Sequence, residues 1–241
     1  MHGIKAILLD IEGTVSPISF VHEVLFPYAR QRIESFLRER GSEAVVAAAA
    51  QLIVEEDRAK NGVNPVPLPD RSDSAFSIPR VRDAAWRLMD CDSKTTGLKQ
   101  LQGLIWDVGY RNGELKSPMF EDVAPAIARW NAAGKKVAIY SSGSIAAQKA
   151  FFSHTVAGDL TRSLGGFFDT TSGPKRSPAS YTNIIRALDN DPAKVLFLSD
   201  VPEELSAARQ AGLQVMLVVR PGNAKVPDSV EARRVTSFDT L

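Results

Sequence analysis

Short apolar runs alternate with helical patterns in the second half of the chain, and this alternation limits the folds open to it. Each run is too short for a typical helix and is bounded by glycine, proline or polar residues, as buried strands are. Strands that alternate with helices form a parallel sheet covered on both faces. The sequence therefore predicts an α/β fold with a Rossmann-like parallel sheet. The predicted strands are Ile4–Leu9, Lys136–Tyr140, Phe167–Asp169, Val195–Asp200 and Leu213–Val219.

A long stretch between the first two predicted strands has helical spacing of apolar residues throughout. We expect Gly41 to end the first of its helices and Ser42 to cap the second. The stretch interrupts the sheet, so we predict a core of residues 1–16 and 117–241 with an all-helical cap, 17–116, inserted after the first strand. The predicted helices of the cap are Phe20–Arg40, Ala44–Lys60, Val81–Met89 and Ser93–Tyr110, with a proline-rich loop over Asn61–Pro79.

Helices are also expected between the later strands. Ser177 supplies a hydroxyl and Pro178 a fixed φ angle, and this pair is a good helix start. The other helices predicted for the core are Met119–Ala133, Ile145–Ser153 and Pro202–Ala211.

Composition excludes several classes of protein. The formal net charge is +1 at pH 7, which gives no support to a nucleic-acid or membrane role. The single cysteine, Cys91, excludes an internal disulfide and a zinc site of several cysteines. The N-terminal residues make a poor signal peptide, and no apolar run approaches the ~18 residues of a spanning helix. We therefore expect a cytoplasmic protein that is a monomer.

Polar side chains stand where the predicted strands end. Asp10 and Glu12 follow the first strand, Ser141 and Ser142 the second, and Asp200 the fourth. The carboxyl ends of parallel strands share one edge of the sheet, where open α/β sheets bind ligands. Carboxylates there suit a cation such as Mg²⁺, and hydroxyls suit an anion. The set indicates phosphoryl transfer with Mg²⁺.

Lys175 adds a positive charge to this set. It lies just before a predicted helix N-terminus, so its ammonium is expected beside free backbone N–H groups, an arrangement that binds anions. Each group alone has a simpler reading: Asp10 as a turn residue, Ser141 to Ser144 as a helix cap, Lys175 as a solvated side chain and Asp200 as an N-cap. Their order and spacing together favour catalysis. A phospho-accepting receiver module pairs similar groups, but it has no need of a long helical insertion after its first acidic strand.

The motifs DIEGT (10–14), YSSGS (140–144), a loop lysine and LSDVPEE (198–204) resemble the four motifs of haloacid dehalogenase-like phosphatases. The stretches SPISFVHEVLFPYA and GELKSPMFEDVAPAI are similar to the enolase-phosphatases of methionine salvage. This resemblance implies that the substrate 2,3-diketo-5-methylthiopentyl-1-phosphate is enolised and then dephosphorylated. The products are the acireductone 1,2-dihydroxy-3-keto-5-methylthiopentene and phosphate. Another small-molecule phosphatase of the superfamily is the alternative.

The resemblance also implies roles for the acidic residues. Asp10 matches the nucleophile that carries an aspartyl-phosphate and also binds the metal, and Asp200 matches a metal ligand. Glu12 stands where many relatives have the aspartate that serves as general acid and base. The metal contact at Glu12 is through either its side chain or its backbone carbonyl. Glu204 would orient Lys175 or a metal-bound water, or be a solvated helix residue.

The remaining implied roles concern the phosphate and the cofactor. Ser141 and Ser142 match residues that bind the substrate phosphate. Lys175 matches the lysine that offsets the charge of the phosphate and the nucleophile. One Mg²⁺ per subunit is the implied cofactor, and the implied partner is a small phosphate ester. Glu12 and a cap residue both stay candidates for the base that starts enolisation.

Overall fold

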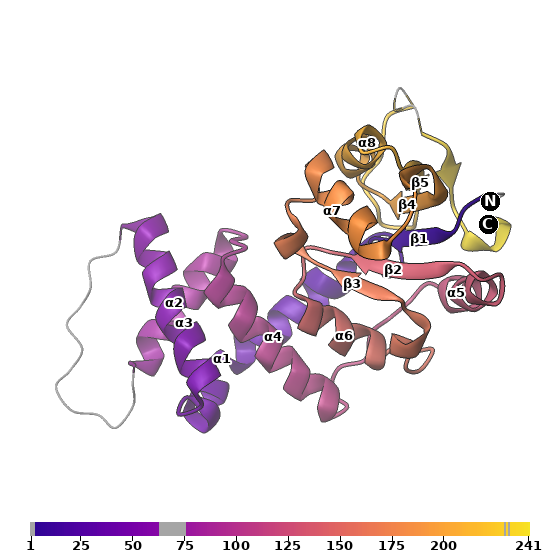
Figure 1. The fold of residues 1–241 in the computed structure, drawn as a ribbon. Helices are drawn as coiled ribbons and strands as arrows, with labels where there is room; N and C mark the ends of the chain where they lie inside the picture. Colours follow the sequence, from indigo (N-terminus) through magenta and orange to yellow (C-terminus); the bar gives the residue numbers. More distant parts are fainter. Residues whose placement is uncertain (1–2, 63–75, 229, 231) are drawn as a thin grey trace. The chain divides into compact units, whose positions relative to one another are not determined.

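The computed structural model describes residues 3–62, 76–228, 230 and 232–241 (Figure 1). It divides into two compact units. Met1–His22 and Leu115–Leu241 form one, called here the core unit, and Glu23–Glu114 form the other, called the helical unit. Most of the proline-rich loop predicted over Asn61–Pro79, including the run Val63–Pro67, lies outside the described residues.

The core unit contains a six-stranded sheet in the order β3-β2-β1-β4-β5-β6, in which every neighbouring pair is parallel. Leu9, the last residue of β1, is paired with Ile139 of β2 and with Leu198 of β4. The residues that follow these three strands therefore emerge together at one edge. The strands are β1 (Ala6–Leu9), β2 (Lys136–Tyr140), β3 (Gly166–Phe168), β4 (Val195–Ser199), β5 (Gln214–Val218) and β6 (Arg234–Val235).

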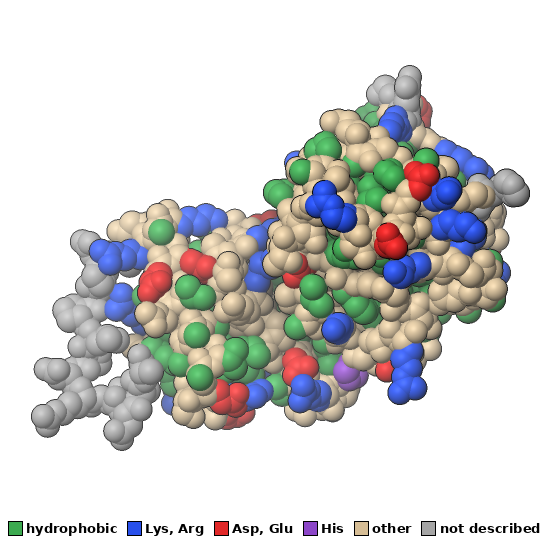
Figure 2. Space-filling model, viewed as in Figure 1, with side chains coloured by type: hydrophobic (Ala, Val, Ile, Leu, Met, Phe, Trp, Pro, Cys, Tyr) green, Lys and Arg blue, Asp and Glu red, His purple; other side chains and the backbone are tan. Residues whose placement is uncertain are grey.

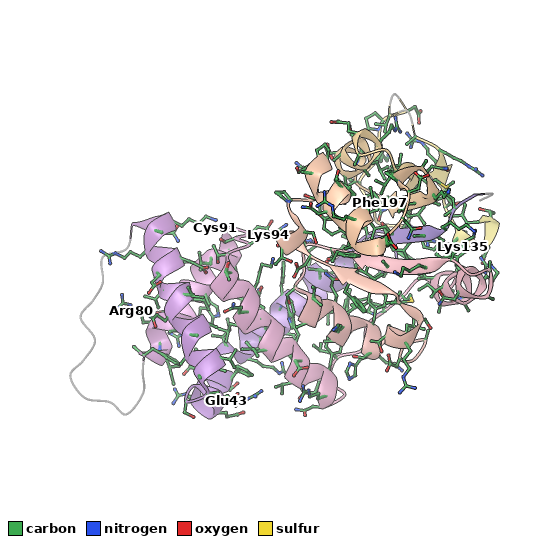
Figure 3. The ribbon with its side chains drawn as sticks, in the orientation of Figure 1. Glu43, Arg80, Cys91, Lys94, Lys135 and Phe197 are labelled. Atoms are coloured by element: carbon green, nitrogen blue, oxygen red, sulfur yellow. The ribbon has the colours of Figure 1, made fainter. Side chains whose placement is uncertain are left out.

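Helices cover both faces of this sheet, which confirms the predicted fold class. Figure 1 shows α7 and α8 on one face and α5 and α6 on the other. Ala6 and Leu8 of β1 share a buried cluster with Tyr181 of α7 and Leu205 of α8, and Phe197 of β4 belongs to the same cluster (Figure 3). Side chains alternate along a strand, so the residues between them face the other layer. The helices are α5 (Val123–Ala132), α6 (Ile145–Ser153), α7 (Pro178–Leu188) and α8 (Pro202–Gln210).

The helical unit packs its own hydrophobic core. A π-helical turn, Phe20–Leu25, leads into its first helix. Gly97 of α4 allows that helix to approach α2 closely, because a Cβ atom at position 97 would lie 2.7 Å from the Cβ atom of Leu52. Buried residues of the core include Ile33, Leu37, Ile53, Leu88 and Leu101. The helices are α1 (Phe26–Arg40), α2 (Ala44–Asn61), α3 (Ile78–Asp90) and α4 (Thr96–Arg111).

Several predicted helix ends differ from the structure. Ser42 does not cap α2, whose N-cap is Glu43. Ser177 is the N-cap of α7, but its hydroxyl makes no capping hydrogen bond to any residue that the structure describes. Pro79 lies in the first turn of α3, where its missing N–H would be unsatisfied in any case. Helix α5 begins at Val123, later than predicted, and the N–H of Phe120 before it donates to the carbonyl of Val15.

Charged side chains of both signs are scattered among hydrophobic ones over the face seen in Figure 2. This mixture agrees with the small net charge of the sequence. None of the helices that the structure describes is both long and apolar enough to cross a membrane.

Candidate active site

Asp10 follows β1 directly and is almost fully buried, with 2% of its surface exposed. Its Oδ1 accepts hydrogen bonds from the backbone N–H of Ile11, at 2.8 Å, and from Nζ of Lys175, at 2.5 Å. Its Oδ2 accepts one from the hydroxyl of Ser199, at 3.1 Å. Three donors from three segments thus hold one carboxylate at the carboxyl edge of the sheet. Such a carboxylate is suited to act as a nucleophile, because its orientation is fixed before substrate binds.

A tight turn follows Asp10 and brings the chain against Asp200. The carbonyl of Ile11 accepts hydrogen bonds from the backbone N–H groups of Thr14 and Val15. Gly13 has φ +72°, and a Cβ atom at this position would overlap the carboxylate of Asp200. Glycine is therefore required at position 13 both by its backbone conformation and by the close approach of Asp200.

Lys175 lies in the loop before α7 and joins two carboxylates. Its Nζ lies 2.8 Å from Oε2 of Glu204 in addition to its contact with Asp10, and its side chain is only 10% exposed. The hydroxyl of Tyr181 donates to the carbonyl of Lys175, at 2.7 Å, and so fixes the loop. Burial disfavours the charged ammonium, but the charges of Asp10 and Glu204 outweigh it and raise the pKa of Lys175. Lys175 is therefore cationic at every physiological pH.

Glu204 is buried, so the interpretation of it as a solvated helix residue is wrong. It lies in the first turn of α8, where its carboxylate meets both Lys175 and the hydroxyl of Ser199. Burial and the charge of Asp10 raise the pKa of Glu204 to about 7. Ser199, which bridges Asp10 and Glu204, was not identified from the sequence as a site residue. Its place at the end of β4, next to Asp200, is the signal that could have found it.

Asp200 follows β4 and does not cap α8, whose N-cap is Val201. Its Oδ1 is buried and accepts no hydrogen bond from any residue that the structure describes. Burial and the charge of Asp10 raise the pKa of Asp200 to about 7. A buried acceptor without a donor, close to other carboxylates, is costly unless a cation is bound to it.

The acidic residues fit a hard divalent cation. Among residues 3–62, 76–228, 230 and 232–241, no group of three or more His, Cys, Asp or Glu side chains is arranged to hold a metal by itself. Mg²⁺ does not require such a group, since it binds through one or two carboxylates, waters and substrate phosphate oxygens. Asp10 and the unpaired Oδ1 of Asp200 supply ligands of that kind.

The second predicted hydroxyl site follows β2. Ser141 is buried; its hydroxyl donates to Oε2 of Glu12 at 3.4 Å and accepts from the N–H of Gly143 at 3.2 Å. Ser142 is partly buried beside it, and Ser144 caps α6 by accepting from the N–H of Ala147. The start of α6 thus presents hydroxyls and N–H groups, a combination that binds anions. Burial and the charge of Asp10 raise the pKa of Glu12.

These contacts bring the site residues proposed from the sequence to one edge of the sheet. A fixed carboxylate, a buried ammonium, anion-binding hydroxyls and an unpaired aspartate are the parts that phosphoryl transfer needs. The family model of haloacid dehalogenase-like hydrolases matches residues 4–212, a range that includes these side chains. Dependence on Mg²⁺ is typical of that family.

Proteins of similar sequence place the chain in a smaller family within these hydrolases. Enolase-phosphatase E1 of Synechococcus elongatus is 47% identical over 99% of this chain and 98% of its own length. Enolase-phosphatase E1 of Persephonella marina is 42% identical over 99% and 98%. The crystal structure of the UTR4 protein of Saccharomyces cerevisiae, 35% identical, superposes with a TM-score of 0.79 and covers 99% of this chain and 100% of that one. The chain therefore belongs to the enolase-phosphatase family within the haloacid dehalogenase-like hydrolases.

Proposed function

We propose that the protein enolises 2,3-diketo-5-methylthiopentyl-1-phosphate and then hydrolyses the phosphate ester, as a step of L-methionine salvage. The products are the acireductone 1,2-dihydroxy-3-keto-5-methylthiopentene and phosphate. The observation that carries the phosphatase half is the buried carboxylate of Asp10, held at a strand end by Lys175. The relatives named enolase-phosphatase E1 support the enolase half and the choice of substrate.

Phosphoryl transfer starts at Asp10. One carboxylate oxygen forms a bond to phosphorus while the bond from phosphorus to the ester oxygen breaks, which leaves an aspartyl-phosphate. Glu12 gives a proton to the departing oxygen and then takes one from the water that releases phosphate. Ser141 and Ser142 hold the phosphate oxygens, and Lys175 offsets the negative charge that gathers around Asp10.

A single Mg²⁺ per subunit fits the residues present. Asp10, Asp200 and Glu12 would hold it, the last through its side chain or its carbonyl. When bound, the ion neutralises phosphate charge and polarises the substrate carbonyl. The unpaired Oδ1 of Asp200 supports this assignment.

Enolisation requires a base that removes a proton from the carbon beside a carbonyl group. Glu12 is the candidate within the core unit, because its raised pKa makes its carboxylate a stronger base than an exposed glutamate. A residue of the helical unit is the other candidate. We assign the helical unit, predicted as residues 17–116, as the cap that excludes water during this step. We also propose a monomer that works in the cytoplasm.

The experiment is an assay on the diketo phosphate with Mg²⁺, in which enol absorbance and phosphate release are recorded separately. Both signals should appear, and a chelator should remove phosphate release. A panel of other small phosphate esters serves as the comparison. Faster hydrolysis of one of those esters, with no enol signal from the diketo phosphate, would favour the alternative of another small-molecule phosphatase.

A further inference from the structure

We propose that Asn223 is a positioning residue, which fixes the backbone of Gly13 against Asp200 and thereby sets the affinity of the site for Mg²⁺. Asn223 lies after β5 and far from the site motifs in sequence. Its Nδ2 donates to the carbonyl of Gly13 at 2.9 Å. The proposal rests on the proposed function only in taking Asp200 as a ligand of the cation.

Gly13 is held between two side chains. A Cβ atom at position 13 would overlap the carboxylate of Asp200 and would lie 3.0 Å from Oδ1 of Asn223. Oδ1 of Asp200 has no hydrogen-bond donor among the described residues, and the carboxylate packs closely against Gly13. A shift of the Gly13 backbone would therefore change the packing of the Asp200 carboxylate and so its position.

The turn that carries Asn223 is itself fixed. The N–H of Asn223 donates to the carbonyl of Arg220 at 3.2 Å, which closes the turn Arg220–Asn223. Pro221 occupies the second position and Gly222, with φ +87°, the third, as a type II turn requires. Asn223 is therefore presented by a turn whose backbone has little freedom.

Arg220 binds this turn to the segment that follows Asp10, which contains Gly13 and Thr14. Its Nε donates to the carbonyl of Thr14 at 3.2 Å, and its Nη2 pairs with Asp122 at 2.9 Å. The rings of Phe120 and Phe238 lie 4.5 and 4.6 Å from its guanidinium carbon. The carbonyls of Gly13 and Thr14 are thus each held by a side chain of one turn. Arg220 is buried in an ion pair, so its removal would threaten folding, whereas Asn223 offers a milder test.

The test compares Asn223→Ala with Asn131→Ala. Asn131 is a matched control, because its Nδ2 also donates to one carbonyl of the core unit, that of Ser163, at 2.8 Å. Mg²⁺ alone is titrated into metal-free protein by calorimetry. We expect Asn223→Ala to weaken Mg²⁺ binding roughly tenfold, in line with other residues that orient metal ligands, and Asn131→Ala to leave it unchanged.

Hydrogen exchange of metal-free protein supplies a second readout. Backbone N–H groups of residues 13–16 should exchange faster in Asn223→Ala than in wild type, and at the wild-type rate in Asn131→Ala. Activity of Asn223→Ala should return at high Mg²⁺, with kcat restored, which a folding defect would not allow.

Three results would overturn the proposal. One is Mg²⁺ affinity in Asn223→Ala equal to that in Asn131→Ala, the second is unchanged exchange over residues 13–16, and the third is a loss of kcat that Mg²⁺ does not restore. A wild-type protein that binds no Mg²⁺ would instead contradict the cofactor of the proposed function, and the inference with it.

Discussion

Nζ of Lys175 lies 2.5 Å from Oδ1 of Asp10, although 165 residues separate the two in sequence. Oε2 of Glu204 also pairs with this ammonium, at 2.8 Å. Lys175 therefore forms ion pairs with both the proposed nucleophile and Glu204. This arrangement keeps the lysine charged and fixed beside Asp10.

Glu204→Gln should slow turnover without unfolding the protein. The amide cannot share the charge of Lys175, so the ammonium shifts toward Asp10 and weakens it as a nucleophile. We expect kcat to fall roughly tenfold, as misplacement of a group beside the reacting atoms does. Glu203→Gln is the matched control, since Glu203 precedes it on α8 and is exposed. Equal kcat values for the two variants would show that Glu204 does not position Lys175.

Glu12→Gln should separate the two halves of the reaction. The variant cannot protonate the leaving oxygen or activate water, so phosphate release should fall about 10²-fold or more. If Glu12 is also the base for enolisation, the variant should show neither enol absorbance nor phosphate release. If a residue of the helical unit is the base, the enol should accumulate. Normal rates for both signals would mean that the side chain of Glu12 has no role.

Asp200→Asn should weaken the binding of Mg²⁺ to the protein. The change removes the negative charge of a buried side chain that we propose as a ligand. We expect Mg²⁺ affinity, measured by calorimetry on the metal-free protein, to fall at least roughly tenfold. Asp228→Asn is the control, because the side chain of Asp228 is fully exposed. Affinity in Asp200→Asn that matched the control would remove Asp200 from the cation site.

We expect Asp57 to make the helical unit sensitive to acid. It is buried beside Arg87, with Nη2 to Oδ2 at 2.7 Å, and accepts from Asn61. Burial opposes ionisation, but hydrogen bonds from Arg87 and Asn61 outweigh it and lower the pKa of Asp57. A carboxyl whose pKa is lower in the folded state stabilises that state above its unfolded pKa of about 3.9, and the stabilisation is lost as the pH falls through the folded pKa.

Asp57→Asn should therefore lower the free energy of unfolding at pH 7 by roughly 1–3 kcal/mol and remove part of its decline below about pH 4. Urea unfolding at several pH values measures both effects. Glu55→Gln, at an exposed position of the same helix, should change neither. A pH profile of Asp57→Asn parallel to that of wild type would contradict the assignment.

The fold class, and the edge of the sheet at which the site lies, could both be predicted from the sequence. Apolar runs that end in Asp10, Ser141 and Asp200 are local patterns, and parallel topology alone brings their ends together. The family suggested by the motifs is confirmed by the relatives. The roles assigned to Asp10, Glu12 and Lys175 remain predictions.

Contacts between distant segments could not be predicted. Strand β6 has two residues, too few for a pattern, and is formed by pairing with β5. Arg220 meets Thr14 across 206 residues, and no local feature marks a buried arginine at a strand end. Glu204 looks solvated on its helix, and only the position of Lys175 shows why it is buried.

Phosphate release by Asp10→Asn tests the central claim most directly. Asparagine keeps the size of the side chain but cannot attack phosphorus as a carboxylate does. With saturating Mg²⁺ and diketo phosphate, the account predicts a loss of phosphate release of at least roughly 10³-fold, with the circular dichroism spectrum of wild type. Phosphate release at a near-normal rate by Asp10→Asn would contradict the account.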